Sequence, residues 1–120
     1  MAKTIRISDD IPEVIPKQRL SLHNLAIASA SDILETALSP LNPTAILRFM
    51  VSVDTAGVFS ARIIRSGNTQ SVDFNSGANL VANSAYMFDL LVHNGDKVNF
   101  RHSAAGTLLV FRATEVPSVE

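Results

Sequence analysis

The feature that most restricts the fold of this chain is a two-residue period of apolar side chains that returns in separate segments. In residues 45–53, every second position from Leu47 to Val53 is apolar. The same period returns in residues 57–64, 85–92, 97–100 and 107–116. Because successive side chains of a strand point to opposite faces, the pattern predicts β-strands that each bury one face in a core.

Turn residues separate these segments at intervals that are typical of an antiparallel sandwich. The five glycines stand at positions 57, 67, 77, 95 and 106, and the longest interval leaves room for one more bend at residues 82–85. Weaker strand patterns occupy residues 19–27, 32–38, 69–74 and 78–82. We therefore predict an all-β fold, an eight- to nine-stranded antiparallel jelly-roll β-sandwich with an extended N-terminal arm.

Residues 31–38 also fit a short helix. Ser31 or Asp32 would cap that helix and Glu35 would close a capping box. The sequence leaves strand and helix open for this segment.

The predicted core collects the apolar residues on the inward faces of the strands. It consists of Leu20, Leu22, Leu47, Phe49, Val51, Val53, Phe59, Ala61, Ile63, Phe74, Leu80, Phe88, Leu90, Val98, Phe100, Leu109 and Phe111. At 120 residues the chain is long enough for one such core but not for two.

Three parts follow along the chain: an extended arm at 1–18, the sandwich at 19–116 and a short tail at 117–120. In the arm, Pro12 and Pro16 exclude a regular helix or a central strand. The arm is nevertheless rich in apolar residues, which indicates that it lies on a protein surface, either its own or that of a neighbouring subunit. The predicted partner-binding residues are Ile5, Ile7, Ile11, Val14 and Ile15.

The polar group His93, Asn94, Gly95 and Asp96 interrupts two apolar runs. Asn94-Gly95 between alternating segments predicts a β-hairpin with a type I′ turn, which requires positive φ at both residues. His93 and Asp96 would then flank the turn in contact with solvent. The alternative, a His–Asp acid–base pair, lacks a nucleophile or an orienting partner in the local sequence.

Other patterns that mark catalytic or metal sites are missing from the sequence. The chain has no cysteine, and His23, His93 and His102 stand at no metal-ligand spacing. We expect His102, near a strand end, to be exposed. There is no G-x-S-x-G motif and no glycine-rich phosphate loop. The sequence thus predicts that the protein is not an enzyme and needs no cofactor.

Net charge and hydropathy bear on two kinds of partner, nucleic acids and membranes. A net charge of −1 does not favour nucleic-acid binding, which needs a clustered basic face. The first ten residues lack the apolar core of a signal peptide, and no apolar run approaches the ~18 residues of a membrane span. We expect synthesis in a host cytoplasm, with neither a membrane nor a nucleic acid as partner.

Several strands also carry apolar residues on the face that points away from the core, including Ile46, Met50, Met87 and Leu91. Only 18% of the residues are charged, below the usual quarter. A second apolar face needs cover, and a closed ring of identical subunits provides it with one repeated interface. We therefore predict a homotrimer. Charged side chains in the strands, such as Arg62 and Asp89, would form either cross-strand pairs or pairs between subunits.

Residues 57–116 resemble the compact jelly-roll modules of virion structural proteins. The resemblance lies in the pattern Y-x-F-x-x-x-V-x-x-G-D-x-V-N-F over residues 86–100 and in a final strand that ends in R-x-x-E-V. Decoration (cement) proteins of tailed-phage heads and tail-fibre tips belong to this group. The sequence also resembles, more faintly, the trimeric sandwiches of the tumour-necrosis-factor and C1q class. The resemblance implies a trimeric capsid decoration protein, located in the virion, that stabilises a viral capsid. The alternative is a ligand- or receptor-recognition module, such as a fibre tip or a carbohydrate-binding sandwich.

Overall fold

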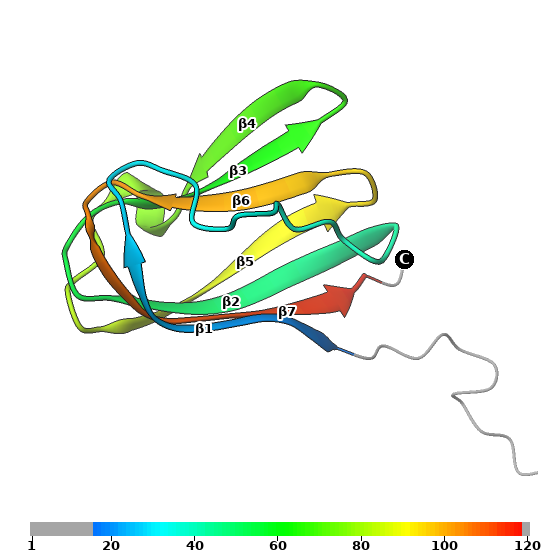
Figure 1. Ribbon diagram of the computed structural model, residues 1–120. Coiled ribbons are helices and arrows are strands. Elements are labelled where there is room, and N and C mark those ends of the chain that lie inside the picture. Colours follow the sequence, from blue (N-terminus) through cyan, green and yellow to red (C-terminus); the bar gives the residue numbers. More distant parts are fainter. Residues whose placement is uncertain (1–15, 119–120) are drawn as a thin grey trace, which may run out of the picture.

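The protein folds into two antiparallel β-sheets that face each other (Figure 1). The computed structural model describes residues 16–118. The strands are β1 (Lys17–Ile27), β2 (Thr44–Val53), β3 (Phe59–Arg65), β4 (Asn68–Asp73), β5 (Ala85–His93), β6 (Lys97–His102) and β7 (Gly106–Pro117), and η1 (Asn75–Gly77) is one short 3-10 turn. One sheet has the order β1-β7-β2-β5 and the other β4-β3-β6. The prediction of an all-β, two-sheet fold is confirmed.

The core lies between the sheets, and its centre is the ring of Phe49. Five other phenylalanine rings lie with centroids 4.9 to 6.0 Å from it: Phe59, Phe74, Phe88, Phe100 and Phe111. Offset and edge-on contacts of this kind add to the stabilisation from burial. All predicted core residues on β2 and β3 are buried.

Four predicted core residues are less buried than expected. Leu20, Leu22 and Phe88 pack against the core only in part, because β1 and β5 are the edge strands of their sheet. Leu109 is half-exposed and Leu108 is buried in its place. A bulge explains the exchange: Ser52 pairs with Val110 and Val53 with Leu108, so Leu109 is an extra residue that reverses the alternation.

Fewer regular strands form than the eight or nine expected; residues 16–118 contain seven. Residues 78–82 contribute only an isolated bridge between Leu80 and Gly57. The first strand begins earlier than expected. β1 starts at Lys17, and Lys17 and Gln18, which the sequence assigned to the arm, pair with β7.

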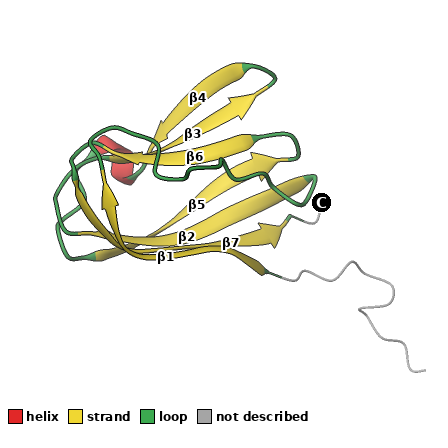
Figure 2. Cartoon of the chain, viewed as in Figure 1, coloured by secondary structure: helices red, strands yellow, loops and turns green. Residues whose placement is uncertain are grey.

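Residues 30–38 are neither helix nor regular strand, and they run along the free edge of β6 (Figure 2). Backbone bonds join Ala30, Ile33 and Leu38 to β6. Between them the side chain of Asn99 replaces the backbone: its Oδ1 accepts from the Leu34 N–H (2.9 Å) and its Nδ2 donates to the Leu34 carbonyl (2.8 Å). This irregular segment protects an edge that would otherwise be open.

The predicted hairpin at Asn94-Gly95 is wrong. β5 pairs with β2 and β6 pairs with β3, so the turn carries the chain from one sheet to the other. Only Gly95 has positive φ (93°), which excludes a type I′ turn. A two-residue hairpin loop occurs instead at Ser66-Gly67, between β3 and β4, where both residues have positive φ (50° and 80°).

Asp96 and His102 are buried, contrary to the prediction that both are exposed. Asp96 binds Arg65 through two hydrogen bonds, from Nε (2.7 Å) and Nη2 (2.8 Å), and accepts a third from the His93 N–H (2.9 Å). The Nε2–H of His102 donates to the Thr55 carbonyl (2.8 Å). Both side chains fasten loops at the sheet ends, because a loop at the rim of a sandwich leaves backbone groups that need partners.

Glu115, on β7, is a further buried polar side chain, in addition to Asn99, Asp96 and His102. Its Oε2 accepts from the backbone N–H groups of Leu41 (2.9 Å) and Asn42 (3.0 Å), and Arg19 forms an ion pair with its Oε1. The carboxylate thus ties the loop before β2 to the two strands β1 and β7.

Candidate interaction surface

The outer face of the four-stranded sheet, on the side away from the core, carries apolar residues on three neighbouring strands. The register places Leu91, Ile46 and Val116 side by side across β5, β2 and β7. Four residues further along the strands, Met87, Met50 and Arg112 form a parallel row. We call this surface, residues 46, 48, 50, 87, 89, 91, 110, 112, 114 and 116, the outer face.

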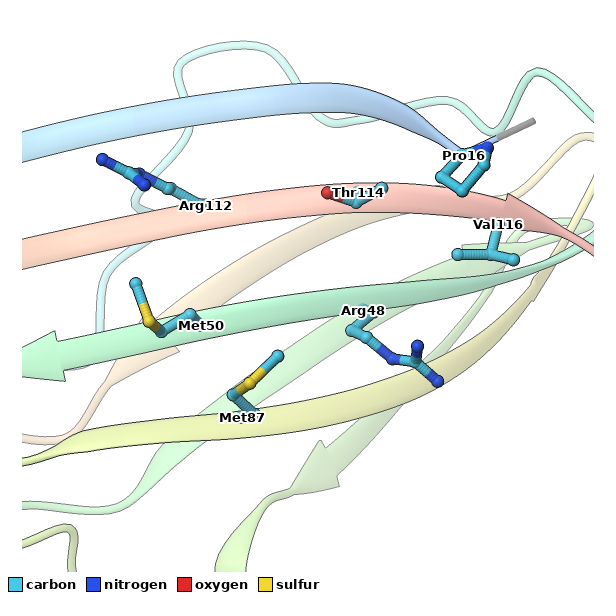
Figure 3. Close-up of a pocket in the computed structure, with 7 residues that line it drawn as sticks. All are labelled: Pro16, Arg48, Met50, Met87, Arg112, Thr114 and Val116. Atoms are coloured by element: carbon cyan, nitrogen blue, oxygen red, sulfur yellow. The ribbon is translucent and has the colours of Figure 1, made fainter.

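A shallow pocket of about 320 Å³ opens on the outer face (Figure 3). Met50 and Met87 line one end, and Val116 and Pro16 line the other. Met87 is 65% exposed, although its side chain is apolar. Methionine side chains are flexible and adapt to partners of different shape, so this lining suits binding of another apolar group.

The two arginines of the outer face differ in whether they form an ion pair. Arg48 lies between the two apolar rows and binds Asp89 through two hydrogen bonds (2.9 and 3.3 Å), which raise the pKa of its guanidinium group. Arg112 is exposed and has no ion pair among residues 16–118. Within residues 16–118, Arg112 is therefore a positive charge beside the methionines that has no carboxylate partner.

The predicted partner-binding residues, Ile5, Ile7, Ile11, Val14 and Ile15, lie outside the described residues. The structure does describe Pro16, the residue that follows them, and its ring forms one wall of the outer-face pocket. The apolar alternation already placed Met50 and Met87 on the second face of their strands. Val116, Thr114 and Arg112 were not predicted beside them, because a strand in isolation does not reveal which strand lies next to it.

A second hollow lies across the other sheet, near the start of β3. Its lining is more polar and includes Ser60, Asp73, Arg101 and Ser103. Arg101 is held by Asp32 from the irregular segment beside β6 (2.7 Å).

Within residues 16–118, no three His, Cys, Asp or Glu side chains come together in an arrangement that could hold a metal ion. In the same part of the chain, no helix has the length and hydropathy needed to cross a lipid bilayer.

Comparison with known proteins adds no relative. No protein-family model matches the chain, and no curated protein matches it with significance.

Proposed function

We propose that this protein is a non-enzymatic structural component of a virus particle, a homotrimeric capsid decoration (cement) protein. The observation that carries the proposal is the outer face, where two rows with exposed apolar side chains lie on either side of the Arg48–Asp89 ion pair. A sheet face in contact with water normally carries polar residues, and exposed apolar side chains that gather on one face indicate a contact with protein. The assembly that a decoration protein covers would be the viral shell.

The strand pairing supports a jelly roll. If residues 30–38 are counted as the second of eight strands, the pairs are β1 with β7, residues 30–38 with β6, β2 with β5, and β3 with β4. First pairs with last, second with seventh, and so on inward. This nested order is what a single antiparallel ribbon produces when it rolls up into two four-stranded sheets.

A closed trimer would cover the outer face of every subunit with one repeated interface. Each subunit would use the same contact to the next, and a ring of three closes without leaving a free surface. Light scattering of the full chain at micromolar concentration should give a mass about three times the 12.9 kDa of one chain. A stable monomer under these conditions would contradict the trimer.

The virion location has its own test. Mass spectrometry of purified particles from the virus or prophage that encodes this chain should detect the protein in many copies per particle. Genes for a capsid protein and a maturation protease beside its gene would agree with this result. Particles that lack the chain would overturn the proposal.

The polar hollow near β3 favours the second candidate function, a recognition module. Its serine, aspartate and arginine side chains could bind the hydroxyl groups of a sugar. Glycan-array screening of the full chain tests this candidate, with Asp73→Ala as the variant that should abolish any signal. An array without signal leaves the decoration protein as the only proposal.

A further inference from the structure

We propose that the outer-face pocket binds residues 9–15 of the N-terminal arm of a neighbouring copy. The inference rests on the proposed function, in which identical subunits cover one another's outer face, and it specifies the segment that covers it. Ile11, Val14 and Ile15 would pack on the two methionines, and an acidic residue of the arm would pair with Arg112.

Charge is the first argument. Residues 9–15 read DDIPEVI and contain three carboxylates and no positive charge. Arg48 and Arg112 line the pocket, and no acidic residue is among the described residues that line it. Arg48 is already bound to Asp89, whereas Arg112 is available for Glu13, Asp10 or Asp9. The charges of the segment and of the pocket are thus complementary.

Apolar matching is the second argument. Beside its three carboxylates, the segment carries four apolar residues, Ile11, Pro12, Val14 and Ile15. The pocket offers the exposed Met87 and the partly exposed Met50 and Val116 as apolar contacts. Both surfaces would otherwise face water, and their contact removes apolar area from water on each side.

Length and position are the third argument. Seven extended residues reach at most about 25 Å, and the four-residue step along β7 from Val116 to Arg112 measures about 13 Å. The segment is therefore long enough to cross the pocket. Since Pro16 is a wall of the same pocket, the root of each arm lies beside the surface that receives the arm of another copy.

The direction of the chain favours a neighbouring copy over the same copy. Pro16 leads directly into β1, so an arm that covered its own pocket would have to reverse within one or two residues. Proline has a fixed φ and restricts the residue before it to an extended conformation, which opposes such a reversal at Ile15 and Pro16. Arms that pass from each subunit to the next close a ring in the same way as any other repeated contact.

Cysteine cross-linking tests the contact directly, since the natural chain contains no cysteine. Full-length Val14→Cys and Met87→Cys proteins are mixed and oxidised. We expect a disulfide-linked pair of one chain of each kind. Val81→Cys is the matched control, because Val81 is exposed to a similar extent (62% against 65%) but lies off the outer face. It should not cross-link with Val14→Cys.

The double variant Val14→Cys/Met87→Cys shows whether the arm in the pocket belongs to a neighbouring copy or to the same chain. Linked oligomers are expected, and a disulfide confined to single chains would overturn the proposal in favour of a chain that covers its own pocket. Equal cross-linking to Val81→Cys would overturn it as non-specific.

A charge substitution provides the independent readout. Met87→Glu should raise the concentration at which the trimer dissociates by about tenfold or more, because it places a carboxylate among the arm's own carboxylates. Val81→Glu should leave it unchanged. A trimer that forms without the Val14–Met87 cross-link would refute this inference alone, whereas a monomeric wild-type protein would refute the proposed trimer as well.

Discussion

At the scale of single residues, the buried polar side chains of this protein hold loops in place. Asp96 has three hydrogen bonds, and the Arg65 guanidinium and the His93 N–H together keep the pKa of its carboxyl group below the usual value. Asp96 lies in the turn that joins the two sheets, and Arg65 lies at the end of β3. The pair therefore fastens the inter-sheet turn to the β3–β4 hairpin.

The Asp96 ion pair should make stability depend on acid pH. An aspartate with a lowered folded-state pKa stabilises the fold fully above its unfolded pKa of about 3.9 and loses this contribution as the pH falls through the folded value. We expect the urea midpoint of the wild type to fall between about pH 5 and pH 2. Asp96→Asn should lower the free energy of unfolding at neutral pH by about 1–3 kcal/mol, and the stability of this variant should depend less on pH.

Asp73→Asn is the matched control for this measurement. Asp73 is exposed and makes no side-chain hydrogen bond among residues 16–118. Asp54, whose pKa is lowered by bonds from Thr107 and Thr55, adds a dependence of the same sign in every variant. If Asp96→Asn and Asp73→Asn had the same pH profile, the role of the Arg65–Asp96 pair would be wrong.

At the scale of elements, the tight hairpin loop forms at Ser66-Gly67 and not at Asn94-Gly95, where the sequence predicted it. Asn94-Gly95 has the composition of a hairpin loop but joins different sheets, whereas Ser66-Gly67 forms the two-residue hairpin loop. The reason is that the apolar alternation on both sides of a turn has the same form in the two cases. A hairpin and an inter-sheet connection both place apolar residues toward the core.

Two substitutions test the conformations of these two turns. Gly67→Ala should destabilise the fold by about 1 kcal/mol or more, because its φ of 80° is unfavourable for any residue with a Cβ atom. Asn94→Ala should change the free energy of unfolding by less than about 0.5 kcal/mol, since Asn94 is exposed and does not have positive φ. Chemical denaturation measures both. A larger loss at Asn94 than at Gly67 would restore the predicted type I′ hairpin.

At the scale of the whole molecule, one phenylalanine cluster joins the two sheets, and its members differ in depth. Phe49 lies on a central strand and is fully buried, whereas Phe88 lies opposite it on edge strand β5 and is partly exposed. An edge strand has a neighbour on one side only. The inner face of β5 is therefore less covered at Phe88 than the inner face of β2 at Phe49.

Phe49→Ala should cost about 3–5 kcal/mol, the usual penalty for a large buried cavity. Phe88→Ala should cost about 1–3 kcal/mol, because less of its ring leaves water on folding. Urea unfolding at equal protein concentration compares the two. Equal losses would mean that another chain covers β5 in solution, and a midpoint unchanged by Phe49→Ala would contradict the core itself.

Local alternation was sufficient to predict the strong strands and most of their inward faces. It did so because the side-chain period of two is a property of the strand alone, as the buried set from Leu47 to Val53 shows. The apolar character of Met50 and Met87 on the second face was also visible at this level. The partner-binding arm residues remain a prediction, since they lie outside residues 16–118.

The sequence determined the strongly alternating strands, whereas the tertiary structure decided what each strand lies beside and left residues 32–38 and 78–82 without a regular strand. The Leu109 bulge, the Asn99 bridge to Leu34 and the burial of Asp96 all depend on residues that are 31 to 65 positions apart or on the register of a neighbouring strand. The outer face likewise exists only because β5, β2 and β7 pair in one register. Such pairings form through long-range contacts, whose choice depends on the packing of the whole core rather than on any local pattern.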